Sequence, residues 1–187
     1  MKKLKDDHDR LKKNKEFERD GLKTELDRIR LLINLDMMGP LYGRSSAITL
    51  GHPDIAASAR LLANELRYDL GVNENSIYSS DNMAFNYADV PSISFNRCGY
   101  QDCGGHTEGD TIENCSAEGL AHIGAMVEAW IERYVISPHV FPFSREFPDA
   151  AKTAVKAWFK DKNPLDYEVY SPAKKYKAKR ALAKKTS

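Results

Sequence analysis

Two residues in this sequence have side chains and settings suited to binding a metal ion. Asp36 follows the apolar run 31–35, and His106 stands in the glycine-rich segment Gly104-Gly105-His106-Thr107-Glu108-Gly109-Asp110-Thr111. Carboxylate and imidazole are both ordinary zinc donors, and flanking glycines free the backbone to present a side chain at a cleft. Asp36 is equally suited to capping a turn or helix, and a single loop histidine does not define a site. Each residue taken alone leaves the chemistry open.

The three cysteines, Cys98, Cys103 and Cys115, allow two interpretations. They are too few for a disulfide scaffold, but Cys98 and Cys103 are close enough in sequence to pair in a loop disulfide. The spacing Cys98-x4-Cys103-x2-His106, with Cys115 further on, also supplies the three thiolates and one imidazole of a structural zinc site. The disulfide is the simpler hypothesis because the zinc spacing is irregular.

The hydrophobic pattern predicts strands that alternate with helices. Strands are expected at 31–35, 47–50, 76–79 and 91–95, and helices from Pro53 to Gly71, at 83–87, from Ser116 to Tyr134, and at 149–160. This alternation predicts an α/β fold with a mainly parallel, mixed sheet flanked by helices, in which the continuous apolar run 31–35 is buried on both faces. Such sheets bind ligands at the carboxyl ends of their strands, where Asp36, Asp81 and the loop 96–114 fall.

Length and composition fit one domain. Of the 187 residues, 42% are hydrophobic, which suits a single core. We expect a charged, helical or partly disordered segment at 1–30, the α/β domain at 31–160, and a basic tail at 161–187. A formal net charge of +1 argues against nucleic acid or acidic lipid as a partner. The sequence shows no membrane span or secretion signal, and the compartment stays open.

Four segments, in order and spacing, resemble a known family. They are Ile33-Asn34-Leu35-Asp36-Met37-Met38-Gly39, Ser80-Asp81 with Phe85, Val90-Pro91-Ser92-Ile93-Ser94, and His106-Thr107-Glu108-Gly109-Asp110-Thr111. Together they resemble the second half of the zinc aminopeptidase family that includes bacterial secreted aminopeptidases, glutaminyl cyclases and the transferrin-receptor ectodomain. The resemblance covers roughly residues 31–135. It implies a zinc-exopeptidase type of fold and hydrolysis of an N-terminal peptide bond by metal-activated water.

The resemblance also implies roles for individual residues. Asp36 and His106 occupy the positions of ligands to two different zinc ions, and Asp81 and Asp110 line the site. Tyr100 precedes the histidine where some relatives place a tyrosine that stabilises the oxyanion. Asn82 replaces a histidine found in many relatives, which weakens the inference for Asp81.

The remaining ligands of the family should precede Asp36. They are a histidine of an H-x-D motif, a bridging aspartate and a glutamate of a Glu-Glu pair, and the segment before Asp36 contains no such arrangement. We therefore expect a partial catalytic domain, with its N-terminal half missing, that holds zinc weakly or not at all and is inactive alone. A non-catalytic remnant or binding module of the same fold is an alternative, and glutaminyl cyclase-like acyl transfer is another.

The expected partners follow from the same resemblance. The family acts on peptides, so a peptide is the expected substrate. A parallel sheet without its N-terminal strands exposes an unpaired edge. We expect that edge to be covered by a second copy of the chain, by a separately supplied N-terminal half, or by the segment 1–30 folded back.

Overall fold

The computed structural model describes residues 26–40, 42–98 and 106–162. Tyr100 and Cys103, most of the charged segment 1–30 and nearly all of the basic tail 161–187 lie outside the described residues. The predicted disulfide and the cysteine-based zinc site involve Cys103, so both remain predictions. Within the described residues, no helix is both long and apolar enough to cross a membrane.

Four strands form one mixed sheet. They are β1 (Leu32–Leu35), β2 (Arg44–Leu50), β3 (Gly71–Asn73) and β4 (Ser92–Cys98), in the spatial order β1-β4-β2-β3. The pairs β1–β4 and β2–β3 are parallel, and β2–β4 is antiparallel. The predicted α/β fold with a mixed sheet is therefore confirmed.

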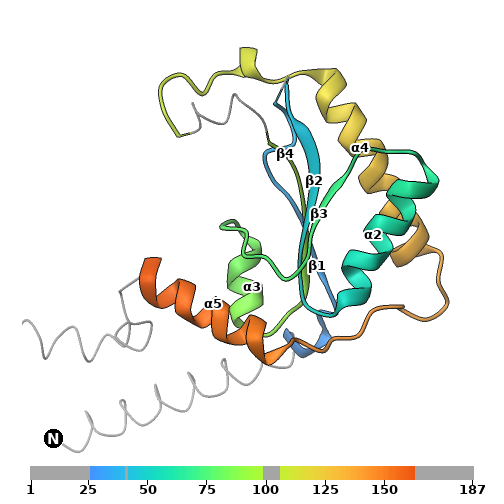
Figure 1. Ribbon diagram of the computed structural model, residues 1–187, viewed down its shortest axis with the longest axis vertical. Coiled ribbons are helices and arrows are strands. Elements are labelled where there is room, and N and C mark those ends of the chain that lie inside the picture. The colour runs from blue at the N-terminus through green and yellow to red at the C-terminus, as the bar shows by residue number, and fades with distance from the viewer. Residues whose placement is uncertain (1–25, 41, 99–105, 163–187) are drawn as a thin grey trace, which may run out of the picture.

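Helices cover both faces of this sheet (Figure 1). Helices α2 (Pro53–Glu65) and α4 (Ala117–Ile131) lie on one face, and α3 (Asn82–Tyr87) and α5 (Asp149–Lys162) lie on the other. The first face carries the larger apolar core, which includes residues of α2, α4, β2 and β4. The second face carries a smaller cluster formed by Leu50, Met83, Phe147, Ala151 and Val155. The sheet is thus the middle layer of three.

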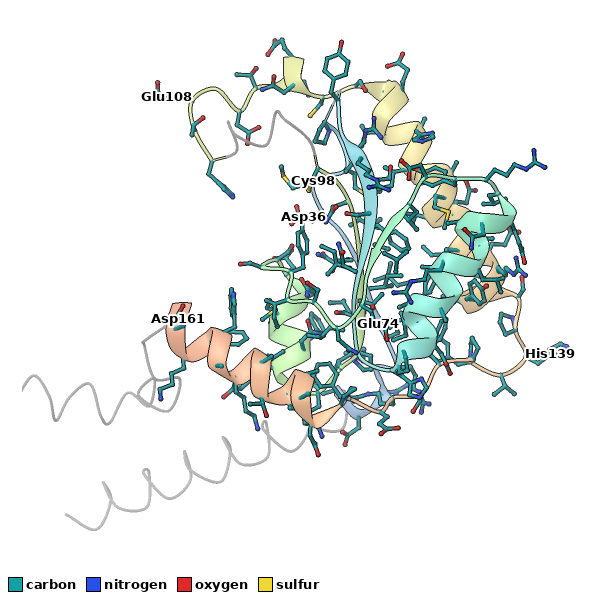
Figure 2. All side chains as sticks on the ribbon, in the orientation of Figure 1. Asp36, Glu74, Cys98, Glu108, His139 and Asp161 are labelled. Atoms are coloured by element: carbon teal, nitrogen blue, oxygen red, sulfur yellow. The ribbon has the colours of Figure 1, made fainter. Side chains whose placement is uncertain are left out.

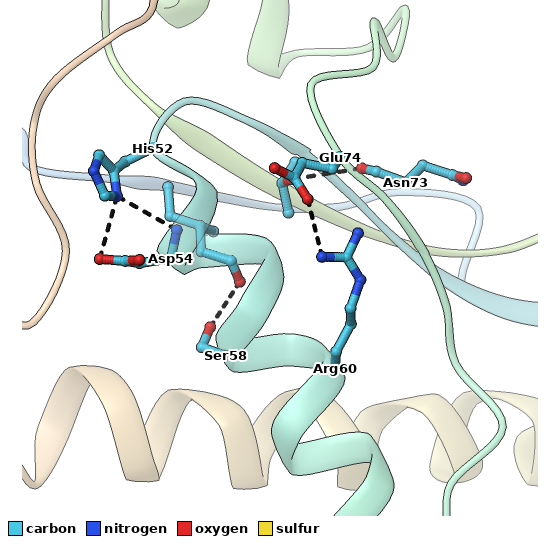
Figure 3. Close-up of polar contacts among 8 residues, drawn as sticks. His52, Asp54, Ser58, Arg60, Asn73 and Glu74 are labelled. Atoms are coloured by element: carbon cyan, nitrogen blue, oxygen red, sulfur yellow. Dashed lines mark hydrogen bonds and ion pairs between the residues drawn. The ribbon is translucent and has the colours of Figure 1, made fainter.

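Two helices begin at side-chain caps. The Ser116 hydroxyl accepts a hydrogen bond from Gly119 N at 2.8 Å at the start of α4, as predicted from the sequence. Figure 3 shows the start of α2, where His52 Nδ1 accepts from Asp54 N at 3.4 Å. The same view shows Arg60 of α2 paired with Glu74 after β3 at 2.9 Å. His52 therefore has a structural role at the start of α2.

Three predicted elements differ from the structure. Residues 76–79 form no strand, and the short strand β3 lies instead at Gly71–Asn73, where the sequence pattern placed only the end of a helix. Helix α2 ends at Glu65 because Arg67 adopts a left-handed backbone with φ 52°. Strand β1 is not buried on both faces, since it lies at an edge of the described sheet and Leu35 is 52% exposed.

Arg145 ties the segment before α5 to two distant parts of the chain. Its guanidinium donates to three backbone carbonyls, those of Ile29 at 2.6 Å, Asp89 at 2.6 Å and Leu26 at 3.1 Å. Arginine has five donors in a fixed planar arrangement, so one side chain can satisfy all three acceptors. The contact fixes where the chain enters β1.

Replacing Arg145 with lysine should destabilise the fold. Lysine keeps the positive charge but cannot hold three carbonyls in a fixed geometry, so we expect the free energy of unfolding to fall by about 2–4 kcal/mol. Urea denaturation of Arg145→Lys measures this change. The control Arg60→Lys alters an exposed ion pair and should cost less than about 1 kcal/mol; equal effects of the two substitutions would show that the carbonyl contacts contribute nothing special.

Candidate functional site

Asp36 lies directly after β1, at the end of the sheet where the carboxyl ends of the parallel strands β1 and β4 lie. Its backbone N–H donates to the Phe95 carbonyl at 3.2 Å, which continues the parallel pairing by one residue. Met37 then turns the chain away with a left-handed φ of 55°. Asp36 therefore stands at the carboxyl end of a strand, the position that the sequence pattern predicts for it.

Two hydroxyl groups hold the Asp36 carboxylate. Ser80 Oγ donates to Asp36 Oδ2 at 2.6 Å, and the Tyr78 hydroxyl donates to the same oxygen at 3.4 Å. Asn34, two residues before Asp36 on the same face of β1, donates from Nδ2 to Ser80 Oγ at 3.0 Å. In metal sites, hydrogen bonds of this kind to a ligand carboxylate hold it in a fixed orientation.

Tyr78 is a hydrogen-bond donor throughout the neutral range. The pKa of its phenol is raised from 10.0 to about 12, mainly by burial and in smaller part by the negative charge of Asp36 and the nearby Cys98, while the neighbouring Asn96 opposes the rise. Figure 2 shows Asp36 and Cys98 close together at this edge of the sheet. The proton on Tyr78 therefore stays available to Asp36.

Asp81 immediately follows Ser80 in the chain. It precedes α3, is exposed, and makes no side-chain cap bond. The next residue, Asn82, is buried, and its Nδ2 donates to Asn86 Oδ1 at 2.9 Å. Asn86 in turn donates to Ser92 Oγ at 2.9 Å. These asparagines join α3 to the polar face of β4.

His106 lies in an exposed turn with a left-handed φ of 63°. Asp110 Oδ2 accepts from the backbone N–H of His106 at 3.4 Å, so this carboxylate orders the turn through the backbone. In Figure 2, Glu108 of the same turn lies well apart from Asp36. The described structure therefore does not join this turn to the Asp36 carboxylate.

The described donors do not form a complete metal site. No group of three or more His, Cys, Asp or Glu side chains in residues 26–40, 42–98 and 106–162 is arranged to hold a metal ion. A catalytic zinc normally has three protein donors and a water, so these residues alone do not fit the ion.

The sequence did not predict the contacts of Tyr78 and Ser80 with Asp36. Both residues lie more than 40 positions after Asp36, Tyr78 within the segment 76–79 that was predicted as a strand and Ser80 directly after it. Only Ser80 fell within a motif, as the residue before Asp81. A hydroxyl next to a motif aspartate was the one available signal.

The raised pKa of Tyr78 predicts a specific loss of stability at high pH. The folded protein keeps the phenol proton up to about pH 12, whereas an unfolded tyrosine loses it near 10.0, so this contribution is present below pH 10 and is lost as the pH rises to about 12. An ultraviolet titration of the protein follows the ionisation of its tyrosines, and Tyr78→Phe should remove the component that ionises at the highest pH. Tyr87→Phe, at a half-exposed residue of α3, should keep that component, and its persistence in Tyr78→Phe would contradict the assignment.

A family model matches most of the chain. The model is that of peptidase family M28, and it matches residues 14–131, which is 118 of 187 residues. The match begins inside the charged N-terminal segment, before the motif resemblance that starts at residue 31. No curated protein and no solved structure matched the chain. Because the family model covers more than half of the sequence, this chain belongs to peptidase family M28, whose members are metallopeptidases and generally zinc-dependent.

Proposed function

We propose that this chain contributes two donors, Asp36 and His106, to the zinc centre of an aminopeptidase. The observation that supports the proposal most directly is the setting of Asp36. Its carboxylate stands at the carboxyl end of β1 and is held by the Ser80 and Tyr78 hydroxyls. A carboxylate that caps a turn needs no hydrogen bonds from distant side chains, whereas a carboxylate that binds a metal is commonly oriented by such bonds.

The same geometry limits what the chain does by itself. In the family resemblance Asp36 and His106 serve different ions, and the described residues form no group of three or more donors that could hold either ion. A single carboxylate or imidazole holds zinc weakly. We therefore propose that the isolated chain is a partial centre, and that tight zinc binding and peptide hydrolysis require further donors.

Zinc titration of the purified chain by calorimetry tests this proposal. We expect binding weaker than about 1 μM, since zinc sites with full donor sets bind far more tightly. The double variant Asp36→Ala, His106→Ala should abolish most of the heat. The control His139→Ala, at another exposed histidine, should preserve it.

Each other outcome of the titration would contradict the proposal. Binding tighter than micromolar would show that more donors converge than the two proposed. Weak heat that survives in the double variant would mean that zinc binds elsewhere. The absence of any heat would favour the alternative of a non-catalytic scaffold.

An activity assay separates the two reaction types that the family resemblance allows. The chain is mixed with excess zinc and offered either an aminoacyl anilide or a peptide with N-terminal glutamine. We expect no turnover above the Asp36→Ala variant with either substrate. Anilide hydrolysis that depends on Asp36 would show that the centre is complete, and Asp36-dependent cyclisation of glutamine would favour acyl transfer over peptide hydrolysis.

A further inference from the structure

Strand β1 presents one edge whose backbone groups have no strand beside them among the described residues. The amides of Leu32 and Asp36 donate toward β4, to Pro91 O at 2.9 Å and Phe95 O at 3.2 Å. Backbone groups alternate in direction along a strand, so those of Leu31, Ile33 and Leu35 point to the opposite edge. In the described sheet, β1 is the terminal strand on that side.

Apolar surface continues from this edge onto α4. A hollow of about 470 Å³ is lined by Leu35 and Met38 at the end of β1, by Val127, Glu128 and Ile131 of α4, and by Glu132 and Ile136 of the segment that follows α4. Leu35 is 52% exposed and Ile136 is 72% exposed. A strand edge next to exposed apolar side chains is the kind of surface that pairs with another strand.

We propose that this edge pairs with β1 of a second copy, antiparallel and across a two-fold axis at Ile33. In this register Ile33 faces Ile33, and Leu31 faces Leu35 of the second copy. All three are outward-pointing residues, so each pair exchanges both of its backbone hydrogen bonds. The two four-stranded sheets then form one continuous sheet.

The backbone selects Ile33 over the two other outward-pointing residues, Leu31 and Leu35, as the centre. A two-fold axis at Leu35 would place Met37 opposite Ile33, and Met37 is not extended because its φ is 55°. An axis at Leu31 would draw residues 26–28 into the ladder, and these are helical. Among the centres that lie on outward-pointing residues, only Ile33 keeps every paired residue within the extended part of the strand.

Charge complementarity supports a second copy as the occupant. In the Ile33 register, exposed Arg30 lies opposite Asp36 of the other copy, and the symmetry repeats this pair. Within one chain the two residues are six positions apart on an extended segment, about 20 Å. Opposite charges directly across a strand pair stabilise the pairing and fix its register.

Sedimentation equilibrium of the full chain in a metal chelator tests the proposal, since the chelator leaves Asp36 free of metal. We expect a mass of twice 21.1 kDa at tens of micromolar. Leu35→Lys should raise the dimer dissociation constant by at least about tenfold, because it places a charge in the apolar contact. Leu61→Lys is a matched control, since Leu61 on α2 is 51% exposed and lies outside the proposed contact. Circular dichroism checks that both variants fold.

Three results would overturn the proposal. A monomer at 21.1 kDa would show that the edge is covered within the chain or awaits a different partner. A dimer unaffected by Leu35→Lys would place the interface elsewhere. An Arg30→Glu variant that dimerises as tightly as the parent would exclude this register, because it sets two like charges opposite each other.

Cysteine cross-linking tests the symmetry axis separately. Ile33→Cys places two thiols on hydrogen-bonded partners whose Cα atoms lie about 5.5 Å apart, within the range that a disulfide spans. Mild oxidation should then give a covalent dimer well above the background of the native cysteines. Leu61→Cys should stay at that background, and equal cross-linking of the two variants would contradict the axis at Ile33.

Discussion

Strand β4 is the element on which the position of every other strand depends. It pairs with β1 on one side and β2 on the other, and its side chains alternate between two different surroundings. Ile93 and Phe95 enter the apolar core, where the Phe95 and Trp130 rings lie 5.9 Å apart. Ser92, Ser94 and Asn96 face the opposite side and are also buried. A slip of one residue would exchange these two sets of side chains, so the register is strongly fixed.

The buried polar face of β4 is satisfied only in part by described groups. Asn86 links α3 to Ser92 and to the Val90 carbonyl, and Ser46 donates to Asn96 Oδ1. Asn82 Oδ1, Ser94 Oγ and Asn96 Nδ2 have no hydrogen-bond partner within the described part of the chain. Partnered polar groups hold α3 in one position on the sheet, and α3 follows the segment that carries Ser80 to Asp36. The position of Ser80 beside the Asp36 carboxylate therefore depends on the polar contacts between α3 and β4.

Local patterns in the sequence predicted the helices and the strands β1, β2 and β4 well. The cap at Ser116, the helix after Pro53 and the strands that contain Ile33 and Ile93 follow from short-range signals. The strand expected at 76–79 was wrong because its alternating residues serve contacts across the chain: Ile77 packs in the smaller cluster and Tyr78 turns toward Asp36. Sequence patterns marked Asp36 as a candidate ligand, but the hydroxyls that hold it come from residues more than 40 positions away. Such a contact is set by the tertiary fold and has no local signature.

The contacts of Arg145 impose an order of events on a chain made from its N-terminus. Its guanidinium reaches Ile29, 116 positions earlier, so the start of β1 cannot be fastened until the segment before α5 has been synthesised. At roughly 5–20 residues per second, translation of the intervening residues takes roughly 6–23 s. Pairing with β4 also waits for residues some 60 positions after β1. During that interval the Leu31–Leu35 segment of a nascent chain is open to chaperones and to neighbouring chains on the same polysome.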